Sequence, residues 1–196
     1  MILNKFLVTL ALCISINAIS QTSKREEGIK LGLKVGLNLA NFGGDIENNA
    51  IRTSIHFGMV SEIIISDKFS FQPELLYSGQ GFKNESILGY SKEKYNYISL
   101  PLLAKYYVAK NLSIESGPQI SFLISSKSKN NDGNTDISDT NVVDFGWNVG
   151  LGYEFKSGIF FQGRYNLGLT NVNAESNSDS NRISNSVFQI SVGCLF

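Results

Sequence analysis

The chain has 196 residues and carries 17 basic and 17 acidic side chains, so its formal net charge at pH 7 is zero. A neutral chain without a long block of like charge gives no support for nucleic-acid binding. Its length suits a single domain. Beyond the N-terminal region no apolar run is long enough to cross a bilayer as a helix, which excludes a helical membrane protein.

The N-terminal region has the features of a secretory signal peptide. Lys5 supplies the positive charge, residues 6–16 form a short apolar core, and Ala18-Ile19-Ser20 fits the small-x-small cleavage pattern. A buried helix is the alternative, and a lipoprotein anchored through Cys13 is disfavoured by the large Leu12 before it. We therefore expect a signal peptide over 1–20, a short N-terminal segment over 21–28 and one domain over 29–196.

Eight extended segments follow the leader, and no helical period competes with them. Most are close to the length of about 9–11 residues that a tilted strand needs to cross a membrane. They lie at roughly residues 29–41, 54–65, 69–79, 95–107, 112–124, 142–155, 159–170 and 186–196.

The connections between these segments alternate between short and long. The short ones lie at 66–68, 108–111 and 156–158, and the long ones, rich in Asn, Ser, Asp and Gly, lie at 42–53, 80–94, 125–141 and 171–185. Outer-membrane barrels have this asymmetry, with short periplasmic turns and longer extracellular loops. The pattern predicts an all-β fold, an eight-stranded antiparallel up-and-down transmembrane β-barrel with both ends on the periplasmic side.

The strand faces divide into a bulky apolar side and a small or polar side. In the segment 142–155 the bulky positions are Val143, Phe145, Trp147, Val149, Leu151, Tyr153 and Phe155, and Asp144, Gly146, Asn148, Gly150, Gly152 and Glu154 oppose them. Eight strands leave an interior only wide enough for side chains or one small ligand. Bulky residues from every strand would overfill that space, so we expect them outside, in contact with lipid.

Outward aromatic residues fall into two bands, which matches the interfacial girdles of such barrels. The band near the short turns comprises Phe69, Phe71, Tyr106, Phe155, Phe161 and Phe196. The band near the long loops comprises Phe57, Tyr77, Phe122, Phe145 and Phe188.

The inward positions carry six charged side chains, namely Lys34, Glu62, Glu74, Lys105, Glu115 and Arg164. An unpaired charge in a narrow lumen is costly, so we expect the three bases to neutralise the three acids and to plug the barrel. A gated ion path is the alternative. Pro73, Pro101 and Pro118 fall inside strands, where they predict β-bulges that could invert the phase of Lys105.

The C-terminal segment alternates strictly, with Phe188, Ile190, Val192, Cys194 and Phe196 on one face. This pattern indicates a strand with one apolar face, which in a barrel would contact lipid and close the cylinder. Cleavage of the leader removes Cys13, so Cys194 can form no internal disulfide and is expected to pack as a small apolar residue.

Several runs of the sequence resemble the PorT-like, or "porin family", outer-membrane β-barrel proteins. They are Gly32-Leu33-Lys34-Val35-Gly36-Leu37-Asn38 and, most specifically, the run from Phe69 to Tyr107. The resemblance covers about residues 29–196. It implies a barrel in the outer membrane of a Gram-negative bacterium, inserted by the barrel-assembly machinery that recognises the C-terminal strand. It does not imply transport; some relatives serve protein secretion or gliding.

No catalytic residues, metal site or cofactor are expected. His56, the only histidine, would need a serine and an acid to make an outer-membrane lipid-modifying enzyme, and no particular serine is marked. The segment Asp132-Gly133-Asn134-Thr135-Asp136 lacks the glycine and glutamate that a calcium loop needs. A secreted, soluble lipocalin-like barrel that binds a small ligand is the other alternative.

The sequence thus predicts a monomeric integral outer-membrane barrel with a structural, surface-interaction or limited transport role. Its expected partners are outer-membrane lipid, the assembly machinery, and an extracellular or secretion-system protein bound through the loops 80–94, 125–141 and 171–185, since function concentrates on loops held by a rigid scaffold.

Deleting Phe196 should impair membrane insertion more than folding in detergent, because the residue completes the predicted C-terminal insertion signal. The measurement compares outer-membrane yield in cells with refolding yield in detergent. A normal membrane yield would contradict the prediction.

Overall fold

The computed structural model describes residues 27–43, 49–50, 52–81, 83–86, 89–130, 133–136, 142–170 and 184–196. Among these residues no helix is long and apolar enough to span a membrane. The predicted signal peptide, the segment 21–26, Asp132 and the loop residues 171–183 lie outside the described part of the chain.

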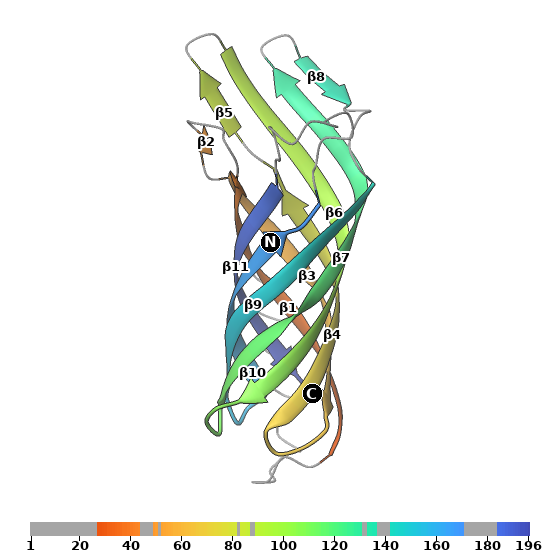
Figure 1. Cartoon of the computed structure of the whole chain (residues 1–196), viewed down its shortest axis with the longest axis vertical. Helices are drawn as coiled ribbons and strands as arrows, with labels where there is room; N and C mark the ends of the chain where they lie inside the picture. Colours follow the sequence, from red (N-terminus) through yellow and green to blue (C-terminus); the bar gives the residue numbers. More distant parts are fainter. Residues whose placement is uncertain are drawn as a thin grey trace, which may run out of the picture.

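Eight long strands correspond to the eight predicted segments (Figure 1). They are β1 (Gly28–Gly43), β3 (Arg52–Ile64), β4 (Phe69–Gln80), β6 (Gly89–Tyr107), β7 (Leu112–Asn130), β9 (Val143–Glu154), β10 (Ile159–Gly168) and β11 (Ser184–Leu195). Three short strands, β2 (Asn49–Ala50), β5 (Lys83–Ser86) and β8 (Gly133–Asp136), lie in connections that the sequence had predicted as loops.

The long strands close into a barrel in which each pairs antiparallel with its neighbours. The ring runs β1-β3-β4-β6-β7-β9-β10-β11, and β11 returns to β1 with a register from Gly32↔Leu195 to Gly43↔Ser184. Leu31 and Phe196 extend this seam by exchanging backbone hydrogen bonds of 3.1 and 2.7 Å. Closure leaves the ring without an unpaired edge, and it confirms the predicted all-β, eight-stranded antiparallel barrel.

The two ends of the barrel differ as the connection lengths predict. Tight turns join β3 to β4, β6 to β7 and β9 to β10 at one end, and the last of these uses Gly158 at a φ of 81°. At the other end the loop prediction was partly wrong, because β6 and β7 continue their pairing as far as Lys92↔Lys129. Figure 1 shows them rising past the rim with β5 and β8 alongside. The backbone groups of β6 and β7 pair in this extension. The residues there do not form the apolar face from which a strand can be predicted.

The bulges expected at the three prolines are absent from the ladders that contain them. The register of β4 with β3 and β6 is constant across Pro73, that of β6 with β7 is constant across Pro101, and that of β7 with β9 is constant across Pro118. The irregularity lies instead between Asn96 and Tyr97. The alternation of faces therefore passes through the prolines unchanged, and the side chain of Lys105 lies inside the barrel, 3 % exposed.

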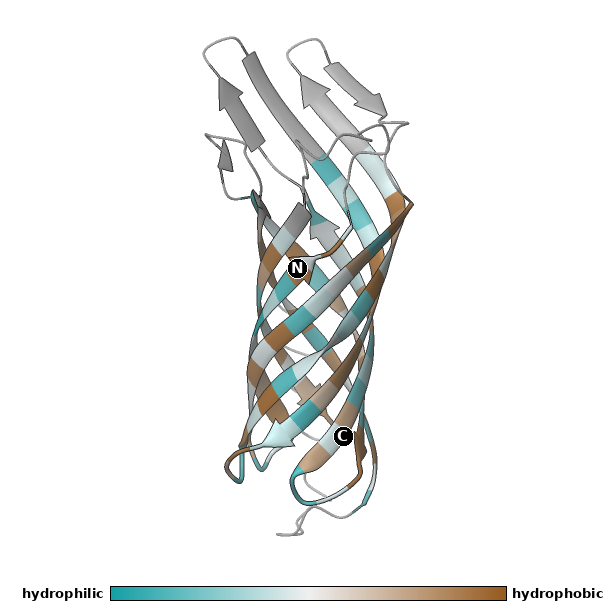
Figure 2. Cartoon of the chain, viewed as in Figure 1, coloured by the Kyte–Doolittle hydropathy of each residue, from teal (hydrophilic) through white to brown (hydrophobic). Residues whose placement is uncertain are grey.

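Apolar and polar residues alternate along the strands, as the banding in Figure 2 shows. Burial assigns the apolar residues mostly to the outer wall and the polar residues mostly to the inner side. On β9, Trp147, Val149 and Leu151 are 43–55 % exposed, whereas Asn148 between them is fully buried. The expectation of only small or polar groups inside was too simple, since Val60, Phe160 and Leu195 form a buried apolar cluster. Lipid can cover the apolar exterior that water would not tolerate over so large an area.

Replacing Val149 with arginine should destabilise the barrel in lipid vesicles by about 2–4 kcal/mol, because the residue lies outward in the middle of β9. Val108→Arg, at an exposed position in a short turn, is the control and should cost about 0–1 kcal/mol, as at a membrane interface. Urea unfolding in vesicles measures both variants. Equal effects of the two would contradict the outward, lipid-facing placement of Val149.

Candidate functional site: the charged interior of the barrel

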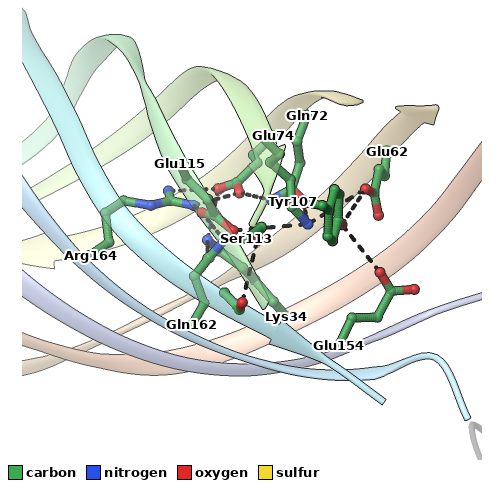
Figure 3. A network of polar contacts seen from close by, with 12 residues as sticks. Lys34, Glu62, Gln72, Glu74, Tyr107, Ser113, Glu115, Glu154, Gln162 and Arg164 are labelled. Atoms are coloured by element: carbon green, nitrogen blue, oxygen red, sulfur yellow. Dashed lines mark hydrogen bonds and ion pairs between the residues drawn. The ribbon is translucent and has the colours of Figure 1, made fainter. Parts of the chain in front are cut away.

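The six charged residues predicted to face inward lie inside the barrel, each from a different strand, and none is more than 3 % exposed. They are Lys34 on β1, Glu62 on β3, Glu74 on β4, Lys105 on β6, Glu115 on β7 and Arg164 on β10. Figure 3 shows the side chains of Lys34, Glu62, Glu74, Glu115 and Arg164 converging from several strands on a common network. Three bases and three acids make the group neutral overall.

The ion pair between Arg164 and Glu74 crosses the full width of the barrel. Its two nitrogens donate to the two carboxylate oxygens at 3.0 and 2.8 Å, a bidentate arrangement. In the ring order β4 and β10 lie four strands apart in either direction, so they are opposite walls. The pair is therefore a bar across the lumen, which a wider barrel could not form between these two side chains.

Lys34 joins the same centre from the β1 wall. Its ammonium lies 2.8 Å from Glu74 and donates to the amide oxygen of Gln162, also at 2.8 Å. The amide nitrogen of Gln162 in turn donates to Glu115 at 2.5 Å, and Arg164 lies 3.5 Å from the same carboxylate oxygen. Gln162 thus bridges a base and an acid, so that each end of its amide meets a charge of the suitable sign.

Gln72 has the equivalent role on the opposite side. Its amide oxygen accepts from Lys105 at 2.8 Å and its amide nitrogen donates to Glu74 at 2.6 Å. The same ammonium lies 3.7 Å from Glu62 and 3.9 Å from Glu115. The two glutamines and the ion pairs together join the six charged side chains into one group, which Glu62 enters through Lys105 and Arg164 enters through its pair with Glu74.

The network continues toward the short turns through Tyr107. Its hydroxyl donates to Glu62 at 2.6 Å and lies 3.3 Å from Glu154, which pairs with Lys30 at 2.8 Å. Tyr107, Glu154 and Lys30 were not among the residues predicted for the network from the sequence. The alternation does put all three on the inward phase, and that signal could have identified them.

Glycines make room for the long side chains. Along one row of the ladder Gly150 lies between Arg164 and Glu115. A methyl group at Gly150 would lie 3.2 Å from the Cβ of Arg164, and one at Gly152 would lie 2.5 Å from Glu115. Because these positions lack side chains, the base of the Arg164 side chain can pack against Gly150 and the carboxylate of Glu115 can lie over Gly152.

The aromatic residues predicted for the short-turn band lie on the outer wall. Phe69, Tyr106, Phe155, Phe161 and Phe196 are 39–52 % exposed, and Phe71 is half-buried. Phe155 makes edge-to-face contacts with Tyr153 and Phe161 at ring-centroid distances of 5.0 and 6.0 Å. This cluster surrounds the end of the β9–β10 hairpin.

A second polar cluster surrounds His56, which is fully buried. Its Nδ1 lies 2.7 Å from Asn38 Oδ1 and its Nε2 lies 2.7 Å from Ser191 Oγ. The amide nitrogen of Asn38 donates to the backbone oxygen of Gly79 at 2.7 Å, which can only accept, and so fixes the amide orientation. The network therefore assigns the proton to Nδ1, and the hydroxyl of Ser191 donates to Nε2.

This Ser–His–Asn chain has the order of a catalytic triad but offers no access to a substrate. Ser191 is 3 % exposed and Asn38 fully buried, and the neighbouring backbone amides of β1, β3 and β11 belong to the ladders rather than to an oxyanion hole. Among the described residues, no group of His, Cys, Asp and Glu has a metal-binding arrangement. The geometry thus gives His56 a structural part in the interior.

A closed barrel with an apolar outer wall and an ion-paired interior defines an integral outer-membrane β-barrel protein. The comparison with family models agrees, since the model described as "Outer membrane protein beta-barrel domain" matches residues 19–174. The chain belongs to this family, and its location is the outer membrane. No curated protein matches the sequence.

Solved structures show the same fold at low sequence identity. Ail, the attachment invasion locus protein of Yersinia pestis, is 10 % identical with a TM-score of 0.53, and the match covers 87 % of this chain and all of that chain. The Neisserial surface protein A is 13 % identical with a TM-score of 0.56 and the same coverage. The match to the outer-membrane family model does not favour the soluble, lipocalin-like alternative.

Glu74→Gln should lower the stability of the barrel by about 3–5 kcal/mol, because Lys34 and Arg164 would lose the carboxylate that they share inside the barrel. The double variant Lys34→Met/Glu74→Gln should lose less, since it removes one charge of each sign. Lys30→Gln, which breaks a partly exposed pair, is the control and should cost about 1 kcal/mol or less. Urea unfolding in vesicles measures all three, and a Glu74→Gln effect no larger than the control would contradict the prediction.

Proposed function

We propose that this protein is a monomeric, non-conducting outer-membrane barrel that acts as a rigid scaffold for surface interactions. The bar formed by Arg164 and Glu74 carries the proposal, because it links opposite walls through two hydrogen bonds of 3.0 and 2.8 Å. The other four charged side chains and two glutamines fill the space around it. An ion could pass this level only by breaking several charge-assisted hydrogen bonds.

The geometry favours this role over the gated ion path. A conducting lumen needs charged groups that water hydrates, whereas these six are at most 3 % exposed and neutralise one another. A gate would require the bar to swing aside, and the bidentate contact holds it from both walls.

The strand extensions at the long-loop end of the barrel support a role in surface interaction. The pairing of β6 with β7 extends to Lys92↔Lys129, beyond the barrel wall, and β5 and β8 pair on either side of it. These strands support the connections 80–94 and 125–141, where we place the contact with an extracellular or secretion-system protein.

Wild-type protein in planar bilayers should give no large, steady conductance. The double variant Arg164→Ser/Glu74→Ser removes the bar without leaving a net charge, and it should admit ions. Lys30→Ser/Glu154→Ser, which removes a pair near the short turns, is the matched control and should stay closed.

Two outcomes would contradict the proposal. One is steady conductance from the wild type, which liposome swelling with a small sugar checks independently of any variant. The other is an open state in the control variant alone, which would place the barrier at the short-turn end rather than at the bar.

A further inference from the structure

The outer wall of the barrel has a notch at Gly163. The other outward positions of β10 hold Phe161, Tyr165 and Leu167, each 42–52 % exposed. A methyl group at Gly163 would have no atom within 4 Å, in contrast to the crowded glycines of the interior. Leu151 on β9 and Ile190 on β11 flank the notch as its register partners.

The notch belongs to an apolar groove of about 230 Å³ on the lipid-facing wall. The groove is lined by the two flanking residues and by Leu112, Tyr153 and Phe161. These last three residues form the outward row next to Gly163 on the short-turn side. The groove therefore covers the rows of Gly163 and Tyr153, on the part of the wall that leads from the middle of β10 toward the short turns.

Two exposed lysines lie in the short turns at the end of this wall. Lys156 is exposed in the β9–β10 turn, directly beyond the aromatic cluster around Phe155. Lys110 is exposed in the β6–β7 turn, and the two turns are neighbours because Glu154 N donates to Asn111 O at 2.9 Å. On this wall the apolar groove is therefore followed, toward the short turns, by the aromatic cluster and then by the two lysines.

The spacing matches half of a bilayer. Lys156 follows Leu151 by five positions (156 − 151), or about 16 Å along an extended strand. A strand tilt of about 35–45° reduces this to roughly 12–13 Å of depth. Since the hydrocarbon core is about 30 Å thick, Gly163 lies near its middle when the lysines lie at the headgroups.

We propose that this wall binds one anionic phospholipid of the periplasmic leaflet, with its phosphate at Lys110 and Lys156 and an acyl chain in the groove over Gly163. The proposal rests on the outer-membrane location and is independent of whether the lumen conducts. A second copy of the chain fits less well, because a two-fold axis along the membrane normal would bring the lysines of both copies to the same end.

Native mass spectrometry of the folded full chain in detergent, titrated with phosphatidylglycerol or phosphatidylcholine, tests the proposal. We expect one phosphatidylglycerol bound in preference to phosphatidylcholine. Lys110→Gln/Lys156→Gln should weaken that binding by about tenfold or more. Gly163→Leu, which fills the groove, should weaken both lipids by at least severalfold. Heat-modifiable gel mobility verifies that each variant is folded.

Matched controls separate the site from general lipid contact. Ala104→Leu also places a leucine at an exposed outward position, on β6, and Lys68→Gln removes an exposed lysine from the β3–β4 turn. Both should leave binding unchanged. Equal affinity of the wild type for the two lipids, or equal losses in Gly163→Leu and Ala104→Leu, would overturn the proposal. So would a dimer that Gly163→Leu abolishes and phosphatidylglycerol does not dissociate.

Discussion

The pairing of Arg164 with Glu74 is the interaction on which the interior depends. Two charges from opposite walls can meet only if the barrel is narrow, and eight strands make it so. Once they meet, Lys34, Lys105 and Glu115 must arrange themselves around the pair, because a charge left alone in so buried a place would be costly. The same narrowness forces the bulky apolar residues to the outside and commits the chain to a lipid environment.

Glycines leave room for polar side chains inside the barrel, and one glycine leaves an open notch on the outer wall. Gly150 and Gly152 leave space that long polar side chains occupy, and Gly36 does so for His56, whose Cε1 would lie 2.6 Å from a methyl group at that position. Gly163 faces lipid and leaves its space open. Inside the barrel, neighbouring side chains fill the space that a glycine leaves. On the outer wall, the space at Gly163 stays open.

The number of long strands, the short turns and the alternation of faces were predictable, because alternation and turn composition are local properties. The lengths of the connections at the other end were not, because β6 and β7 pair beyond the wall without an apolar face. The prolines illustrate a limit of that reasoning. Bulges were expected at Pro73, Pro101 and Pro118, yet the ladders keep their register across all three. In the described pairing of β6 with β7 the register shifts between Asn96 and Tyr97, where nothing in the local sequence marks it.

The sequence by itself determined the all-β barrel, the inward phase of the six charged residues and the apolar outer wall, since each follows from a period of two and from counting strands. Only the tertiary structure decided which base meets which acid, that Gln72 and Gln162 join them, and that Ser191 rather than another serine meets His56. These contacts depend on strand register and on which walls face each other across the lumen. Both are set by the closure of β1 on β11, an event between the two ends of the domain.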